Sequence, residues 1–322
     1  MRILVTGGAG FLGTLLTQRL LQADDSGDLD VTEVICLDLA PSPIEDPRVR
    51  SIVGGVDDPA AIHEALTDGA DAIVHLAAVL SGGSEEDMDL AMRVNVDGTR
   101  LLLEACRARR ADDESATAPV FVLTSSLAVF GGDVPDVVPP TWATQPDSTY
   151  GATKAIAELL VNEYSRRGFI DGRICRLPTI SVRPGRPNSA ASSFASGIIR
   201  EPLRGERSNV PVPLDTRMWL SSPRTAVENL LIALQVPGEK LGRWRAIDVP
   251  GITVTVAEML DSLERVGGAA ARALVTEEAD ERIASIVTSW PGAFESERLL
   301  ELGFVRDDSF DAIIEQFVAD ES

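Results

Sequence analysis

Three glycines near the start of the chain place the tightest constraint on its fold. Gly7, Gly10 and Gly13 lie between a short apolar run, Ile3–Val5, and a segment over 11–20 whose leucines recur with helical spacing. A chain that passes from strand to helix through such a turn can bring its backbone close to a phosphate group. The N–H groups at the start of the helix favour the negative charge of that phosphate. The glycines therefore predict a strand–helix unit that binds a pyrophosphate.

Strand-like and helix-like segments alternate through the first half of the chain. The expected strands are Ile3–Val5, Val34–Leu37, Val49–Val53, Ala72–Leu76, Val120–Thr124 and Ile174–Leu177. The expected helices are Pro59–Leu66, Met88–Arg109 and Thr149–Arg166. Strands separated by helices form a parallel sheet with helices on both faces. We therefore predict an α/β fold, a Rossmann-type doubly wound parallel sheet with a smaller C-terminal substrate-binding domain.

The composition and periodicity of the sequence change after Pro178. Residues 179–220 are rich in Pro, Ser and Arg and have no clear period. Later segments expected to be regular are the helices Thr225–Gln235, Val256–Val266 and Phe310–Val318 and the strand Trp244–Asp248. We assign residues 1–178 to a cofactor-binding domain, to which part of 216–250 is added, and residues 179–322 to a smaller substrate-binding domain.

Charge and cysteine usage exclude several classes of protein. A formal net charge of -21 disfavours nucleic acid and anionic membranes as partners. The sequence has no apolar run of about 18 residues and no signal-like start, so we expect a cytoplasmic location. Cys36, Cys106 and Cys175 stand far apart in apolar stretches, which predicts buried thiols. No metal ligands are predicted, because Cys and His lack metal-site spacing.

An acidic residue ends the second expected strand. Asp38 follows Gly13 by 25 residues, where a carboxylate can accept hydrogen bonds from the hydroxyls of an adenine ribose. It would repel a 2′-phosphate, and no basic residue follows closely. The preferred cofactor is therefore NAD rather than NADP.

A tyrosine and a lysine share one face of an expected helix. Tyr150 and Lys154 are four positions apart, and only two of the 29 Lys and Arg residues are lysines. A nearby ammonium lowers the pKa of a phenol, which can then act as a general base on an alcohol. Ser126 follows an expected strand and is chosen over Ser125 as the group that orients the alcohol oxygen.

These features together resemble the extended short-chain dehydrogenase/reductase family, and the likeness covers essentially the whole chain. Further matching runs lie at 75–78 (His-Leu-Ala-Ala) and 93–99 (Arg-Val-Asn-Val-Asp-Gly-Thr). The resemblance implies an NAD site made of Gly7, Gly10, Phe11, Leu12, Gly13, Asp38, Val56, Leu76, Ala77, Ala78, Asn95, Tyr150, Lys154 and Pro178.

The resemblance also implies roles for residues around that site. Asn95 would support a proton relay behind Lys154, and His75 would pack near the cofactor. The family often has Asp after the third strand, where this chain has Gly55. The contact to adenine would then come from Val56 or from Asp57.

Within the family, the chain is most similar to the branch that oxidises D-erythronate, notably over 176–188 and 215–219 and, late in the chain, at 289–291 (Ser-Trp-Pro). This implies oxidation of the C2 hydroxyl of a small anionic sugar acid with four carbons. Arg217 is the first candidate for binding the carboxylate and Arg183 the second, since a guanidinium can bind carboxylates with two hydrogen bonds. Either arginine could instead make a surface or interdomain ion pair. Ser81 and Asn188 could bind substrate hydroxyls or serve only their loops.

Two other functions stay open. A nucleotide-sugar epimerase could use the same Ser, Tyr and Lys, whereas a non-catalytic NAD-binding sensor is disfavoured because Tyr150 and Lys154 are both present. Dehydration is disfavoured because Thr124 is followed by Ser125-Ser126, where dehydratases of the family have Asp-Glu.

Two further patterns concern surfaces. Segments 99–106 and 155–164 are apolar on more than one side, which favours a helix-packed homodimer unless both faces cover the sheet. Residues 172–217 contain eight arginines and three acids. This stretch is either a positive funnel for an anionic substrate or a coincidence of composition.

Overall fold

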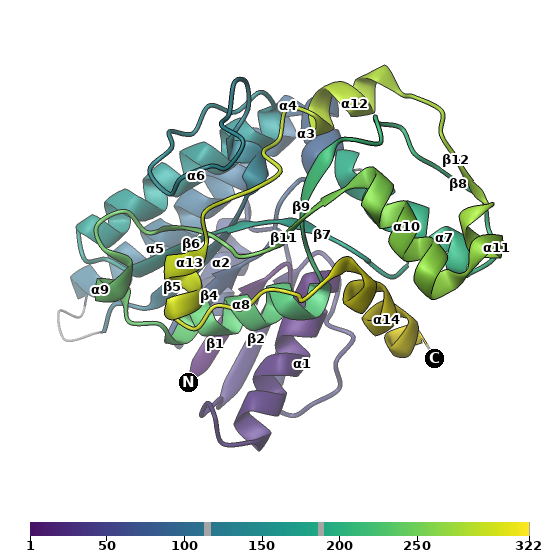
Figure 1. Ribbon diagram of the computed structural model, residues 1–322. Helices are drawn as coiled ribbons and strands as arrows, with labels where there is room; N and C mark the ends of the chain where they lie inside the picture. Colours follow the sequence, from purple (N-terminus) through teal and green to yellow (C-terminus); the bar gives the residue numbers. More distant parts are fainter. Residues whose placement is uncertain (113–116, 186–189, 322) are drawn as a thin grey trace.

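Six strands from the first 177 residues and one later strand, β10, build a seven-stranded parallel sheet in the order β10-β6-β5-β4-β1-β2-β3. Figure 1 shows the computed structural model, which describes residues 1–112, 117–185 and 190–321. The strands of this sheet are β1 (Arg2–Thr6), β2 (Glu33–Asp38), β3 (Val49–Val53), β4 (Ala72–His75), β5 (Val120–Ser126), β6 (Asp171–Leu177) and β10 (Ala246–Asp248). The predicted doubly wound fold is confirmed.

Helices cover both faces of this sheet because its central strands are apolar on both sides. On one side lie α1 (Phe11–Asp25) and α8 (Pro223–Gln235), whose leucines share a core with β1 and β2. On the other side lie α2 (Pro59–Leu66), α5 (Thr99–Asp112) and α6 (Thr149–Arg166). The predicted bounds of α2 and α6 match the structure at both ends.

A second group of elements lies to the right of the sheet in Figure 1. Its strands are β7 (Thr179–Ile180), β9 (Arg217–Ser221) and β11 (Ile252–Thr255) in one sheet, and β8 (Ser208–Asn209) with β12 (Val275–Thr276) in another. Its main helices are α7 (Phe194–Leu203), α10 (Val256–Gly267) and α14 (Phe310–Glu321). They share a separate apolar core, to which Ile198, Met259 and Ile313 belong.

Short helices complete the described chain. They are α3 (Ser81–Glu86), α4 (Met88–Ala91), α9 (Gly238–Leu241), α11 (Ala269–Arg272), α12 (Glu281–Val287) and α13 (Glu297–Glu301). The three cysteines are buried and free of disulfides, as predicted. No helix within the described ranges is both long and apolar enough to span a membrane.

The helix expected over Met88–Arg109 is present and runs on to Asp112, but its middle is not α-helical. The chain forms α4, then a π-helical stretch over Met92–Gly98, and then α5, without a gap between them. A Cβ on Gly98 would lie 2.8 Å from Cγ2 of Val56, so the helix backbone runs very close to that residue. Asn95 in the same stretch is hydrogen-bonded to the backbone of Val79. Such π segments inside α-helices are often found at functional sites.

Candidate active site

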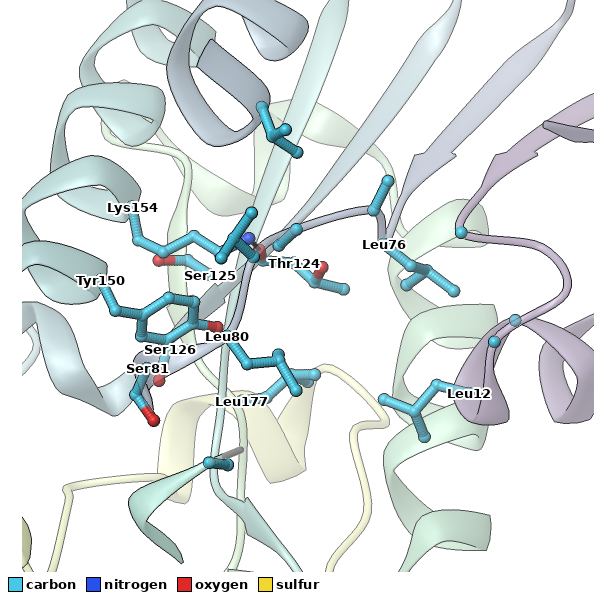
Figure 2. Close-up of a pocket in the computed structure, with 18 of the residues that line it drawn as sticks. Leu12, Leu76, Leu80, Ser81, Thr124, Ser125, Ser126, Tyr150, Lys154 and Leu177 are labelled. Carbon is cyan, nitrogen blue, oxygen red and sulfur yellow. Dashed lines mark hydrogen bonds between the residues drawn. The ribbon is translucent and has the colours of Figure 1, made fainter. Parts of the chain in front are cut away.

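A cavity of about 580 Å³ opens at the carboxyl ends of the parallel strands (Figure 2). It runs from the glycine turn after β1 to the start of α6, which is where ligands bind in doubly wound folds. Predicted residues that line it are Gly7, Gly10, Phe11, Leu12, Gly13, Asp38, Val56, Leu76, Ala77, Ala78, Ser81, Ser126, Tyr150, Lys154, Pro178 and Arg183. Asn95 and Arg217 do not line it, and Asn188 lies outside the described residues.

The glycine turn has no room for side chains. A Cβ on Gly13 would lie 2.1 Å from the carbonyl oxygen of Gly7, and Gly7 itself has φ +69°. Helix α1 begins immediately after Gly10, and no described side chain caps its first turn. The backbone N–H groups there can therefore serve an anion in the cavity. This cradle fits the pyrophosphate of a dinucleotide.

The acidic residues beside the glycine turn are fixed by backbone and ion-pair contacts. Asp38 ends β2, and its Oδ2 accepts a hydrogen bond from the N–H of Ala9 at 3.0 Å. Asp57 pairs with Arg93, with 3.2 Å between Oδ2 and Nε. A Cβ on Gly55 would lie 2.4 Å from Oδ1 of Asp57, so glycine leaves room for that carboxylate.

The first turns of α6 bring Tyr150 and Lys154 into the cavity (Figure 2). Ser148 caps the helix by accepting a hydrogen bond from the N–H of Gly151. A Cβ on Gly151 would lie 2.0 Å from the carbonyl oxygen of Ala128, so only glycine allows this close packing. The Nζ of Lys154 donates to the carbonyl oxygen of Thr124 at 2.8 Å. Burial lowers the pKa of Lys154 to about 8, which the carboxylate of Glu158 opposes.

Burial is the main influence on the pKa of Tyr150, which it raises to about 12. The groups that lower this pKa are the Ser126 hydroxyl, through a hydrogen bond, and the positive charge of Arg183. The Nζ of Lys154 lies 5.7 Å from the centre of the Tyr150 ring. That Lys154 lowers the pKa of Tyr150 stays a prediction.

The two serines at the end of β5 have different partners. The Oγ of Ser126 accepts a hydrogen bond from the N–H of Ala128 at 3.1 Å and also bonds to Tyr150. Ser125 donates to Oε1 of Glu158 at 2.6 Å and is buried. The structure thus places Ser126, not Ser125, against the tyrosine.

A buried ionic network supports this end of the sheet. Arg176 in β6 donates to both carboxylate oxygens of Glu158, at 2.9 and 2.7 Å. Its Nη1 donates to Oδ1 of Asp248 in β10 at 3.2 Å, and its guanidinium lies 4.8 Å from the centre of the Phe130 ring. All three charged groups are nearly inaccessible to solvent. Charges so buried are tolerated only when fully paired.

The two candidate carboxylate-binding arginines lie in different places. Arg183 is half-buried in the cavity wall, close enough to Tyr150 for each to affect the other's pKa. Arg217 is exposed in a separate hollow of about 780 Å³, where its Nη1 donates to the carbonyl oxygen of Asp136 at 3.4 Å. Because β9 carries Arg217 away from the cavity, we now rank Arg183 first; which arginine binds the carboxylate stays a prediction.

Asn95 does not line the cavity but hydrogen-bonds to two segments that do. Its Oδ1 accepts from the N–H of Val79 at 2.8 Å, and its Nδ2 donates to the carbonyl oxygen of Val79 and to Thr153, each at 3.1 Å. It thereby ties the segment after β4 to α6. Ser81, at the start of α3, lines the cavity and accepts from the N–H of Ala191 at 3.1 Å.

Comparison with known proteins agrees with this geometry. Residues 3–222 match the NAD dependent epimerase/dehydratase family. The chain belongs to this family. It is 49% identical to a D-erythronate dehydrogenase of Cupriavidus necator, covering 99% of this chain and 98% of that protein. It is 44% identical to a D-erythronate dehydrogenase of Haemophilus influenzae, covering 99% of each.

Solved structures of family members agree over the whole chain. A nucleoside-diphosphate-sugar epimerase of Agrobacterium tumefaciens is 40% identical, with a TM-score of 0.94 over 100% of this chain and 94% of that one. A UDP-glucose 4-epimerase of Thermus thermophilus, solved with NAD, is 22% identical with a TM-score of 0.79 and shares the fold. The matched region covers 99% of this chain and 99% of the Thermus thermophilus chain.

One wall of the cavity is made of residues that were not predicted from the sequence. Trp290 lines the cavity from the segment between α12 and α13, and Ser192 and Thr179 line it from the second group of elements. Trp290 packs against two apolar cores. The one signal for Trp290 in the sequence is that it lies in the run 289–291, which matches the same branch of the family. No chemical role is predicted for that run.

Proposed function

We propose that the protein oxidises the C2 hydroxyl of D-erythronate to 2-dehydro-D-erythronate with NAD as the oxidant. High identity to two D-erythronate dehydrogenases over nearly the whole chain supports this substrate. The observation that carries the proposal is the guanidinium of Arg183 in the cavity that also holds Tyr150 and Ser126. A small acid needs a cation beside the reacting alcohol, and Arg183 supplies one.

The residues at the glycine turn fit NAD. A Cβ on Gly7 would lie 2.9 Å from the N–H nitrogen of Ala77, so a side chain would close the cradle. The pyrophosphate would lie on the first turn of α1, and Asp38 would accept hydrogen bonds from the ribose hydroxyls. When bound, NAD accepts the hydride from the substrate carbon.

The side chains at the other end of the cavity would handle the substrate. Tyr150 would remove the proton of the C2 hydroxyl, and Ser126 would hydrogen-bond the alcohol oxygen. Lys154, fixed on the carbonyl of Thr124, would hold the nicotinamide ribose. Arg183 would bind the carboxylate, and its charge favours the phenolate form of Tyr150.

A substrate panel followed by absorbance at 340 nm tests the proposal. The protein is incubated with excess NAD and with D-erythronate, D-threonate, L-erythronate or longer aldonates. We expect steady NADH release with D-erythronate. No NADH with any four-carbon acid would refute the proposal.

An epimerase is the alternative, supported by the 40% identical structure that carries that description. An epimerase regenerates its NAD in each cycle, whereas a dehydrogenase releases NADH. UDP-sugars in the same panel decide between the two: their turnover with a flat trace at 340 nm would favour the epimerase. A protein that binds NAD but turns over neither class would be a sensor, although Tyr150 and Lys154 both line its cavity.

We also propose a homodimer that packs through α6. Ile156 and Leu159 on this helix are 37% and 60% exposed, although both are large and apolar. We expect light scattering to give twice the chain mass for the wild type and a lower mass for Leu159→Glu. An unchanged mass in that variant would place the contact elsewhere.

A further inference from the structure

Helix α7 holds the backbone of the segment that carries Arg183. The N–H of Arg183 donates to the Oγ of Ser196 at 3.0 Å, and the Oγ of Ser181 donates to the carbonyl oxygen of Ala195 at 2.9 Å. One turn further along α7, Nη1 of Arg200 donates to the carbonyl oxygen of Arg183 at 2.6 Å. Both backbone polar groups of Arg183 are therefore held by side chains of one helix.

Arg200 is an unusual residue for a purely structural contact. It is 2% exposed, and its Nη2 pairs with Oε1 of Glu201. The Nε of Arg200 and Oε2 of Glu201 are buried and have no hydrogen-bond partner among the described residues. An incompletely satisfied buried charge costs free energy, so a hydrophobic side chain would pack into α7 more favourably.

The side chains of Arg200 and Arg183 differ in their surroundings. Arg200 pairs with Glu201, whereas Arg183 lines the cavity beside Tyr150. Burial, together with the charge of Arg200, lowers the pKa of Arg183. A carboxylate bound by Arg183 would gain a charge-assisted hydrogen bond, whereas a neutral ligand would not.

We infer that Arg200 is a positioning residue for the substrate carboxylate: it fixes the backbone of Arg183, so that the guanidinium of Arg183 meets the anion. This inference rests on the proposed oxidation of a sugar acid. It assigns to α7, outside the cofactor cradle, the task of distinguishing an acid from a neutral sugar.

The test compares D-erythronate with its C1 amide, which has the same shape without the charge. The main variant combines Arg200→Met with Glu201→Gln, so that neither buried charge is left alone. We expect KM for the acid to rise about tenfold, because a displaced guanidinium loses charge-assisted hydrogen bonds. The KM for the amide and both kcat values should change less than about twofold.

Two further variants separate positioning from general damage. Arg200→Lys keeps the charge and one donor, and should recover part of the affinity for the acid. Arg204→Gln removes an exposed guanidinium that directly follows α7 and pairs with Glu321 of α14, and it should behave as the wild type. Circular dichroism and NAD binding confirm that each variant is folded.

Equal increases in KM for acid and amide would overturn the inference, as would an unchanged KM for the acid. If the wild type oxidises no four-carbon acid, the proposed function fails first. The acid-against-amide contrast is then measured by calorimetric binding to the NAD complex, and a wild type without that contrast would overturn the inference as well.

Discussion

His75 should make the folded protein sensitive to mild acid. The ring is 1% exposed between two hydroxyls, with Nδ1 2.7 Å from Oγ1 of Thr6 and Nε2 3.0 Å from Oγ1 of Thr99. Thr99 donates its proton to the carbonyl oxygen of Asn95 at 2.7 Å, so Nε2 of His75 must carry the ring proton. Burial lowers the pKa of His75 to about 3.

The sign and size of the effect follow from this pKa. In the unfolded chain the imidazole titrates near 6.5, so between about pH 6.5 and 3 the unfolded chain binds a proton that the folded protein does not. The free energy of unfolding therefore falls as the pH falls through this window. At 1.36 kcal/mol per pKa unit, the loss is about 2 kcal/mol at pH 5 and about 5 kcal/mol when complete.

Urea unfolding at a series of pH values measures this loss. The chain contains one other histidine, His63, which is exposed on α2 and provides a matched control. Between pH 7.5 and 5, the wild type and His63→Gln should lose about 2 kcal/mol more than His75→Gln. Carboxylates titrate alike in all three proteins and cancel in the comparison. If His75→Gln loses as much as the wild type, the buried neutral imidazole is not the cause.

Three further predictions concern charged side chains. Glu158→Gln should lower the unfolding free energy by about 3–5 kcal/mol because it leaves a buried guanidinium underpaired, whereas Glu228→Gln in a half-exposed pair should cost less than about 1 kcal/mol. Similar losses in urea unfolding would contradict this. Arg183→Met should raise KM for D-erythronate at least about tenfold, and Arg217→Met less than about twofold. The reverse order in steady-state kinetics would return the carboxylate to Arg217. Asp38→Gly should reduce the preference for NAD over NADP at least about tenfold, since it removes a charge repelled by the 2′-phosphate. An unaltered ratio of the two kcat/KM values would exclude that role.

Local patterns in the sequence were enough to predict the sheet and the cofactor end of the cavity. Each strand is a short apolar run, and the glycine turn requires small residues for reasons that act within a few positions. Asp38 ends the strand β2, and Tyr150 lies in the first turn of the helix α6. The topology of the sheet brings both residues to the carboxyl ends of the strands. These groups could therefore be predicted from the sequence, although the distances between them could not.

Charge counts along the chain were less informative, because they do not show which charges are paired. Of the arginines between 172 and 217, Arg173, Arg176 and Arg200 are buried against carboxylates, and Arg204 pairs with Glu321. Paired in this way, these four arginines contribute little to a positive funnel; whether the stretch acts as one stays a prediction. The partners come from as far away as the last turn of the chain, which no local count can detect.

The π-helical stretch within the helix over 88–109 could not be predicted for the same reason. Gly98 can contact Val56 and Asn95 can contact Val79 only after the strands have assembled. Helical periodicity describes one element alone, whereas these contacts belong to two. The choice between Arg183 and Arg217 likewise depends on where β9 runs after the second group of elements has folded.

The late position of β10 in the sequence, far from its partner strand β6, has a consequence for biosynthesis. This strand pairs with β6 through Ala246–Asp248, and Asp248 supplies one of the two carboxylates around Arg176. As a ribosome releases the chain from its N-terminus, β6 emerges with an open edge and an underpaired buried arginine. The short β10 can cover the edge of β6 only after the entire 179–245 stretch has been translated. The nascent chain therefore spends that interval with an exposed strand edge, which is where chaperones would be needed and where a stalled or truncated product would aggregate.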